Sequence, residues 1–215
     1  MNNDERMAWY LRSLLPDFPE DCENIAKVAE KEYVPIIKRE TANLIKTLLL
    51  LIRPERVLEI GTAIAYSTIF MAKYLPAKAK ITTIEQNEKR ILSAKKNIER
   101  LGLTEKIELK EGNASEILSK LTENYEFIFM DAAKGQYGSW LPHLLSHLKT
   151  GGILLSDNVF FEGRILESRF LVSRRQRTIH SRMRQFLYQI SHHEQLQTTV
   201  LPIGDGVSLS VKCEP

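Results

Sequence analysis

The sequence has few of the residues that build cross-linked or membrane-bound proteins. Only two cysteines are present, Cys22 and Cys213, and their wide separation excludes a disulfide framework and a zinc site as the basis of the fold. The most apolar run, residues 48–52, is far too short to span a bilayer. The first six residues, MNNDER, lack the basic start and the apolar stretch of a secretory signal. These absences predict a cytoplasmic protein without membrane contact.

A strong overall charge is also absent. The formal net charge at pH 7 is +3, which is too small to indicate nucleic-acid binding by itself. The charge is distributed unevenly, because residues 164–184 contain seven arginines and one acid, Glu167. That segment carries a net charge of +6, so the rest of the chain is near −3.

Neither internal repeats nor low-complexity linkers divide the chain. Its 215 residues, 43% hydrophobic and 27% charged, fit one globular domain with a sizeable core. We predict a single domain over 1–215, with N-terminal helices in 1–52 and an α/β core in 53–215. Pro16 and Pro19 interrupt the N-terminal helices, and Pro35 is predicted to open a helix that runs to Ile52.

From residue 53 onward, apolar β-branched runs alternate with helical patterns. Repeated strand–helix units predict a mostly parallel sheet with helices on both faces. A long arginine-bearing helix, residues 168–192, then precedes two strands whose Gly-Asp-Gly joint predicts an antiparallel pair at one edge. The predicted strands are 56–60, 80–85, 106–110, 126–131, 152–157, 196–201 and 206–212, and the helices between the first five are 65–74, 88–101, 114–121 and 136–148.

Oxygen-bearing side chains follow two of these strands. Asp131 ends one apolar run, Asp157 and Asn158 end another, and Lys134 lies three residues past Asp131. The carboxyl ends of neighbouring parallel strands meet at one edge of a sheet, where ligand crevices form. Hard oxygen ligands suit Mg²⁺ or Ca²⁺ rather than zinc. The alternative is that both aspartates are ordinary strand-ending turn formers.

The first strand leads into a turn that suits a nucleoside cofactor with a cationic group. A nicotinamide dinucleotide would require a G-x-G-x-x-G turn, whereas Gly61 stands alone here. Glu59 would repel a pyrophosphate but favours a ligand with an amino group. Glu85 ends the second strand, where an acid can accept hydrogen bonds from ribose hydroxyls. In the alternative reading, Glu59 and Glu85 are solvated strand ends.

Taken in order, these motifs resemble a known family. The series is Glu59-Ile-Gly-Thr, Glu85, Gly112-Asn-Ala114, Asp131-Ala-Ala-Lys134 and Asp157-Asn158. It resembles the metal-dependent, S-adenosylmethionine-dependent O-methyltransferases of the catechol and caffeoyl-coenzyme A type, over roughly residues 35–212. The resemblance implies the Rossmann-like class I methyltransferase fold, an α/β fold with a seven-stranded, mostly parallel sheet, one antiparallel strand and helices on both faces.

The resemblance also implies roles for individual residues. The methionine and turn side of the cofactor site is assigned to Glu59, Gly61 and Ser67, its ribose side to Glu85, its adenine side to Asn113 and Ala114, and Asp131 to both cofactor and metal. Two departures put cofactor affinity in doubt: the family often has Gly where this chain has Ala65, and Asp where it has Asn113.

The implied chemistry combines a divalent cation, Mg²⁺ or another, with a basic side chain. Asp131, Asp157 and Asn158 would hold the cation, which lowers the pKa of a substrate hydroxyl and directs it toward the methyl group. The substrate would present two adjacent oxygens. Lys134 would take the hydroxyl proton or stabilise the oxyanion, unless it is a surface lysine at a helix entry.

Within the family, the closest resemblance is to the bacterial tRNA 5-hydroxyuridine methyltransferases. It is carried by residues 131–137, 157–164 and 202–210 and by the arginine-rich segment. This resemblance implies conversion of 5-hydroxyuridine to 5-methoxyuridine at the tRNA wobble position and, because similar bacterial proteins are commonly dimers, a homodimer in which the N-terminal helices are a candidate contact surface. The residues expected to contact phosphates of the anticodon loop are Arg164, Arg174, Arg175, Arg177 and Arg182.

Two other functions stay open. A small-molecule catechol or caffeoyl-CoA-like O-methyltransferase would need an aromatic wall near the metal, which Tyr137, Trp140, Phe160 and Phe161 could form. A non-catalytic RNA-binding module is disfavoured, because the proposed ligand set is complete.

Overall fold

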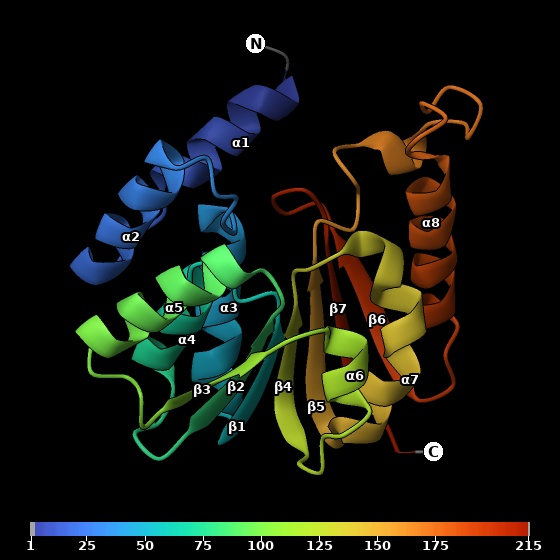
Figure 1. The fold of residues 1–215 in the computed structure, drawn as a ribbon. Coiled ribbons are helices and arrows are strands. Elements are labelled where there is room, and N and C mark those ends of the chain that lie inside the picture. The colour runs from blue at the N-terminus through green and yellow to red at the C-terminus, as the bar shows by residue number, and fades with distance from the viewer. Residues whose placement is uncertain (1–2, 215) are drawn as a thin grey trace.

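The computed structural model describes residues 3–214, which form one seven-stranded sheet flanked by helices (Figure 1). The strand order is β3-β2-β1-β4-β5-β7-β6, and β7 alone runs in the direction opposite to the other six strands. This arrangement confirms the predicted fold class. The strands are β1 (Arg56–Ile60), β2 (Lys80–Glu85), β3 (Ile107–Glu111), β4 (Tyr125–Met130), β5 (Leu148–Asp157), β6 (Leu196–Leu201) and β7 (Val207–Lys212).

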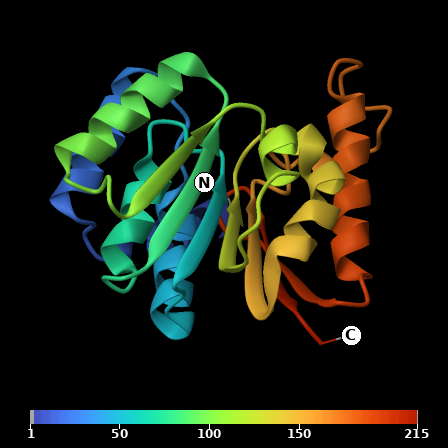
Figure 2. The ribbon, with the colours of Figure 1, turned by 60° about the horizontal axis from the view of Figure 1, so that its bottom comes forward.

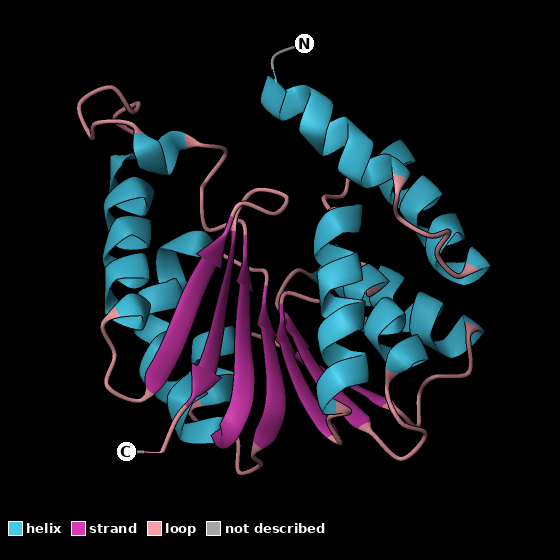
Figure 3. Ribbon diagram, turned by 180° about the vertical axis from the view of Figure 1, so that it is seen from behind, coloured by secondary structure: helices cyan, strands magenta, loops and turns pink. Residues whose placement is uncertain are grey.

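Helices cover both faces of the sheet, because alternate strand side chains point to opposite sides. Phe127 and Phe129 of β4 join one apolar cluster, whereas Ile128 and Met130 join the other. The first cluster packs against α2 (Glu20–Lys31), α3 (Arg39–Ile52), α4 (Tyr66–Tyr74) and α5 (Glu88–Arg100), and the second against α6 (Ala114–Leu118), α7 (Tyr137–His147) and α8 (Arg177–Ser191). Figures 2 and 3 show these two helical layers from below and from behind.

The N-terminal helix, α1 (Asn3–Ser13), rises beside the carboxyl edge of the sheet, on the side away from α8 (Figure 1). Four large apolar side chains of this helix, Met7, Trp9, Tyr10 and Leu11, are more than half exposed. No helix in residues 3–214 has both the length and the apolar character needed to cross a membrane.

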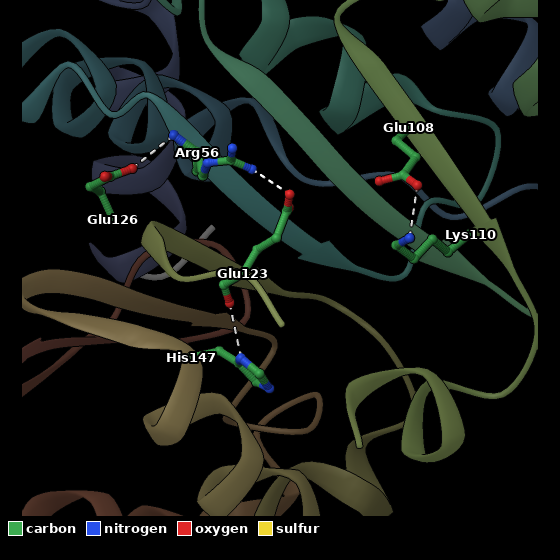
Figure 4. Close-up of polar contacts among 6 residues, drawn as sticks. All are labelled: Arg56, Glu108, Lys110, Glu123, Glu126 and His147. Carbon is green, nitrogen blue, oxygen red and sulfur yellow. Dashed lines mark hydrogen bonds and ion pairs between the residues drawn. The ribbon is translucent and has the colours of Figure 1, made fainter. Parts of the chain in front are cut away.

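Polar contacts hold the opposite, amino edge of the sheet (Figure 4). The Arg56 backbone N–H donates to Glu126 over 2.7 Å, and its guanidinium lies 2.6 Å from the Glu123 carboxylate. His147 Nδ1 lies 2.9 Å from the Glu123 carbonyl oxygen, which attaches the end of α7 to the same edge. His147 therefore has a structural partner at the amino edge of the sheet.

Two predicted helix starts are wrong. Residues 168–176 form a loop, and α8 begins only at Arg177. No glycine or proline marks this boundary; instead, the loop carbonyls of Phe170 and Val172 accept hydrogen bonds from the Arg177 guanidinium. Similarly, α3 begins at Arg39 rather than at Pro35.

Candidate active site

A cleft of about 870 Å³ opens at the carboxyl ends of β1, β2 and β4. Its walls come from the turn after β1, the ends of β2 and β4, the start of α6 and the segment before α3. The predicted site residues that line it are Gly61, Ser67, Glu85, Asn113, Ala114, Asp131, Lys134 and Asn158. Glu59 and Asp157 are 0% and 1% exposed and lie behind the cleft wall. Most of the predicted site residues thus gather at one cleft on the predicted edge, but the sequence does not indicate which acids are buried.

Gly61 is required by a close approach of the backbone to itself rather than to a ligand. Its φ is +104°, and its amide N–H donates to the Ile84 carbonyl oxygen over 3.0 Å. A Cβ at this position would overlap the carbonyl oxygen of Asp131 and lie 2.8 Å from its carbonyl carbon. The missing side chain therefore allows the end of β1 to pack against the end of β4.

Glu59 is enclosed by three hydroxyl groups. Ser67 Oγ donates to its carboxylate over 2.5 Å, Thr83 Oγ1 donates over 2.6 Å, and Thr68 Oγ1 donates as well. Burial raises the pKa of Glu59 to about 7, although these hydrogen bonds lower it in part. Ser67 lines the cleft, so its hydrogen bond connects the buried Glu59 carboxyl to the cleft wall.

The buried Glu59 carboxyl predicts a specific pH dependence of folding stability. Its pKa is about 7 in the folded protein and near 4.5 when exposed, so the folded state holds a proton between those values that the unfolded state releases. The contribution of Glu59 to stability therefore falls as pH rises from 4.5 to 7. As pH rises through this window, the unfolding free energy of Glu59→Gln should therefore increase by on the order of 3 kcal/mol relative to that of the wild type.

Urea unfolding of the cofactor-free proteins at pH 5 and pH 8 measures this difference. Glu85→Gln is the matched control, because its carboxylate also lies at a strand end but is held by backbone N–H groups. An equal pH dependence in the wild type and Glu59→Gln would contradict the predicted protonation of Glu59.

Glu85 and Asn113 lie in the cleft with part of their hydrogen-bonding capacity already used. The Glu85 carboxylate accepts N–H bonds from Ala63, Gln86 and Asn87, each over 2.9 Å. A carboxylate has about four acceptor positions, so one remains for a ribose hydroxyl. Asn113 Oδ1 caps α6 by accepting the Ser115 N–H over 2.9 Å, which leaves its amide N–H groups as the freer donors.

The two aspartates of the predicted metal site lie beside each other, with Asp157 buried and Asp131 half-buried at the cleft wall. Asp157 Oδ1 accepts the Asn158 N–H over 2.8 Å, whereas its Oδ2 is buried without a hydrogen-bond partner among the described residues. Burial, and then the charge of Asp131, raise the pKa of Asp157 to about 7. Burial also raises the pKa of Asp131, against the opposing charges of Lys134 and Arg90.

This arrangement fits a divalent cation. A buried carboxylate oxygen without a partner, next to a second carboxylate, is costly unless a positive charge compensates it. Residues 3–214 contain no cluster of three or more His, Cys, Asp or Glu side chains placed for a metal, so the amide of Asn158 would complete the set. Asn158 has φ +54°, a left-handed conformation that asparagine tolerates better than most residues.

Lys134 reaches this group from the start of the short 3₁₀ helix η1 (Lys134–Gln136). Its Nζ donates to Asn158 Oδ1 over 3.2 Å, and it lines the cleft. A surface lysine at a helix entry would point away from the acids. Lys134 is instead placed to interact with a ligand that occupies the cleft.

Four charged residues that line the cleft are not among the predicted site residues: Lys38, Arg90, Glu162 and Asp205. Asp205 accepts the Glu162 N–H through Oδ2 over 2.8 Å, and its charge also raises the pKa of Asp157. Arg90 lies in the first turn of α5. The Gly-Asp-Gly joint could have indicated Asp205, but its glycines are equally explained by a tight turn between strands.

The five predicted RNA-binding arginines are in different environments. Arg164 is ion-paired to Glu162 and lies over the Phe161 ring. Arg182 donates to the Gly135 carbonyl oxygen next to Lys134, and Arg177 donates to loop carbonyls. Arg174 and Arg175 are exposed, with no hydrogen bond or ion pair to any described residue.

Comparisons with known proteins point to one family. A sequence model of the O-methyltransferase family matches residues 18–213. A catechol O-methyltransferase from Niastella koreensis is 36% identical over 121 residues, and the match covers 54% of this chain and 55% of that protein, about half of each. Caffeoyl-CoA O-methyltransferase 3 from Nicotiana tabacum is 28% identical over 209 residues, covering 92% of this chain and 85% of that protein.

Solved structures agree with this assignment. A proposed caffeoyl-CoA O-methyltransferase from Staphylococcus aureus has a TM-score of 0.89 and 32% identity, covering 95% of this chain and 98% of that one. An O-methyltransferase from Bacillus cereus, solved in complex with SAH, has a TM-score of 0.83 and 24% identity, covering 96% of this chain and 97% of that one.

Proposed function

Because the chain belongs to the O-methyltransferase family, we propose that it transfers the methyl group of S-adenosylmethionine to one of two adjacent oxygens of a substrate bound beside a divalent cation. The observation that carries this proposal is the buried Asp157 Oδ2, which has no partner in residues 3–214 and lies beside Asp131, Asn158 and Lys134. A site that only bound a nucleoside would have no use for an uncompensated carboxylate at this position.

The other end of the cleft suits the proposed cofactor. Glu85 retains an acceptor for a ribose hydroxyl, and Asn113 and Ala114 begin α6 at the cleft wall. The Bacillus cereus relative binds SAH in the same fold. In the turn after β1, Ala63 and Ala65 adopt left-handed φ values of +46° and +66°, a conformation that glycine adopts without strain. The two alanines thus take the conformation that further glycines would favour.

At the ends of β4 and β5, Asp131, Asp157 and Asn158 would hold the divalent cation. Lys134 is the charged group beside them. A bound divalent cation would lower the pKa of a substrate hydroxyl. The Lys134 ammonium would stabilise negative charge on the nucleophilic oxygen, or its neutral amine would accept the hydroxyl proton. Trp140 and Phe161 line the cleft and would exclude water from the reacting atoms.

A small aromatic substrate, a catechol or a caffeoyl-CoA-like ester, is the first candidate. The relatives described above are named for substrates of this class. Of the four aromatic residues expected to form a wall, Trp140 and Phe161 line the cleft. Tyr137 is fully buried, and the Phe160 ring packs against Gly206 outside the cleft lining.

Methylation assays with S-adenosylmethionine, Mg²⁺ and a catechol test this proposal. The expected result is methylation that stops when excess chelator is added and returns with Mg²⁺. Full activity in chelator would exclude the metal-dependent mechanism. A second arm replaces the catechol by tRNA that contains 5-hydroxyuridine, followed by nucleoside analysis for 5-methoxyuridine.

The tRNA wobble uridine is a second candidate, favoured by the loop between η2 (Arg164–Leu166) and α8. Side chains on one face of α8 hold this loop and η2 before it. Arg177 donates to the Val172 carbonyl, His180 Nε2 lies 3.1 Å from the Glu167 carbonyl, and Arg184 donates to the Ile165 carbonyl of η2. The loop lies at the end of the molecule toward which the carboxyl ends of the parallel strands point (Figure 1). It contains Phe170, 83% exposed, and the exposed Arg174 and Arg175. Exposed aromatic rings and arginines together favour single-stranded RNA.

If this loop binds RNA, replacing Arg174 and Arg175 together by alanine should weaken tRNA binding about tenfold and lower the log–log salt slope by between about 1 and 2 units. Arg177 is left in place, because its loss would disturb the loop itself. The control replaces Lys96 and Arg100, which are exposed on α5 on the other side of the molecule (Figure 1).

Filter binding at several salt concentrations measures both variants. Methylation of a small catechol by the Arg174/Arg175 variant should be unchanged, because both arginines lie outside the cleft lining. Unchanged tRNA affinity in this variant would contradict the role assigned to the loop and leave the small aromatic substrate as the sole candidate.

A further inference from the structure

Beyond the residues that would hold the cation, we propose that the Tyr137 hydroxyl is a positioning group that sets the separation of Asp131 and Asp157. This inference rests on the proposed function, because it concerns the same metal site. Tyr137 is the first residue of α7, is 0% exposed and lies outside the cleft lining. It therefore acts through the residues it holds, without touching substrate or cofactor.

The hydroxyl contacts three backbone groups that flank the metal ligands. Its oxygen accepts the Ala132 N–H over 3.2 Å. It also lies 3.2 Å from the carbonyl oxygens of Met130 and of Asp157, which share the single hydroxyl proton. Met130 and Ala132 are the residues on either side of Asp131. One side-chain atom thus connects the end of β4 to the end of β5.

This connection replaces sheet hydrogen bonds that have ended. The last paired residues of β4 and β5 are Met130 and Ser156, one position before each aspartate. Beyond that point the ends of β4 and β5 have separate backbone partners. The Asp131 N–H donates to the Ile60 carbonyl of β1, and Asp157 pairs with Val207 of β7. The distance between the two carboxylates is therefore not fixed by the β4–β5 ladder.

The position of the hydroxyl is itself well determined. The Tyr137 ring packs edge-on against Phe186 of α8, with ring centroids 5.4 Å apart, and lies 6.4 Å from the Trp140 ring. Burial raises the pKa of Tyr137 well above its ordinary value, so the hydroxyl remains a proton donor. Tyr137 also follows η1 directly, so the same residue fixes the helical turn that carries Lys134.

The test compares Tyr137→Phe with two controls. Tyr125→Phe makes the same chemical change at the other end of β4, where the hydroxyl is buried without a partner in the described chain. Thr198→Val removes a hydroxyl that makes two hydrogen bonds in β6, away from the cleft, and controls for lost hydrogen bonding in general. Circular dichroism and thermal melting establish that each variant is folded.

Direct titration with Mn²⁺, followed by electron paramagnetic resonance of the free ion, measures metal binding without any reaction. We expect the dissociation constant to rise about tenfold in Tyr137→Phe, within the range known for groups that orient metal ligands, and to be unchanged in both controls. Binding of S-adenosylhomocysteine should stay within about twofold. In assays, the Mg²⁺ concentration for half-maximal rate should rise about tenfold, while kcat at saturating Mg²⁺ recovers to within a few-fold.

Tyr137→Phe with the same Mn²⁺ affinity as Tyr125→Phe would overturn the positioning role while leaving the proposed function intact. A loss of affinity equal to that of Thr198→Val would also overturn it, since the effect would then be general destabilisation. Failure of the wild type to bind Mn²⁺ would instead overturn the metal-dependent function, and this inference with it.

Discussion

Asp157→Ala is expected to lower metal-dependent methyl transfer by about a thousandfold or more, while binding of S-adenosylhomocysteine changes by less than about twofold. The loss corresponds to the several kcal/mol that a bound metal contributes to transition-state stabilisation. Cofactor binding should survive because Asp157 lies behind the cleft wall and contributes nothing to its lining.

The stability of this variant separates loss of a ligand from loss of the fold. The substitution removes both a buried oxygen without a partner in the described chain and a bond to the Asn158 N–H, two effects of opposite sign. The unfolding free energy of the metal-free protein should therefore change by no more than about 1 kcal/mol. Ser156→Ala, which removes a buried and similarly unpartnered hydroxyl from the same strand, is the control and should keep full activity. A thousandfold loss of methyl transfer in Ser156→Ala as well would mean that the loss in Asp157→Ala reflects disturbance of β5 rather than the loss of a metal ligand.

Gly61→Ala should be more damaging to the whole protein than any of the substitutions above. The added Cβ would overlap the carbonyl oxygen of Asp131, and φ +104° is a conformation that alanine rarely adopts. We expect a loss of about 2–5 kcal/mol in unfolding free energy, from overpacking and backbone strain together. Because relief of the overlap must move Asp131, cofactor and metal binding should both fail in whatever protein still folds.

Gly102→Ala is the matched control for this effect. Gly102 also has a left-handed φ, +64°, but a Cβ there would meet no atom within 4 Å. Its cost should be limited to the conformational term, about 1 kcal/mol, and its activity should be normal. Chemical denaturation and calorimetric titration with S-adenosylhomocysteine measure both variants. Equal costs at the two positions would show that the contact with Asp131 is unimportant.

The sequence predicted the elements that local patterns determine. The β-branched runs located the first two strands to the residue, and the acids at the carboxyl ends of the strands indicated the edge where the cleft lies. Burial depends on tertiary packing, so the sequence could not show that Glu59 and Asp157 lie behind the cleft wall while Glu85 and Asp131 line it. The three hydroxyls around Glu59 come from α4 and β2, which no spacing rule brings together.

The error at the start of α8 has a tertiary cause. Residues 168–176 have helix-compatible composition, but the Arg177 guanidinium binds the carbonyls of Phe170 and Val172 and so competes with helical hydrogen bonds. His180 and Arg184 likewise contact the carbonyls of Glu167 and Ile165, just before this segment. The same contacts changed the interpretation of the basic segment, because an arginine that holds a loop is not free to hold a phosphate. Charge counted along a sequence cannot separate these two uses.

The stretch Pro35–Lys38, which is not part of the following helix α3, links the N-terminal helices to the cleft. All four residues line the cleft, and Gly204 packs close to Lys38 across from it. A protein that lacks residues 1–52 would keep every strand of the sheet, but its cleft would lack the wall that Pro35–Lys38 form. Ligand occupancy should therefore slow hydrogen exchange in α2 and α3 as well as in the sheet, so that these two helices respond to the ligand as part of the same folding unit.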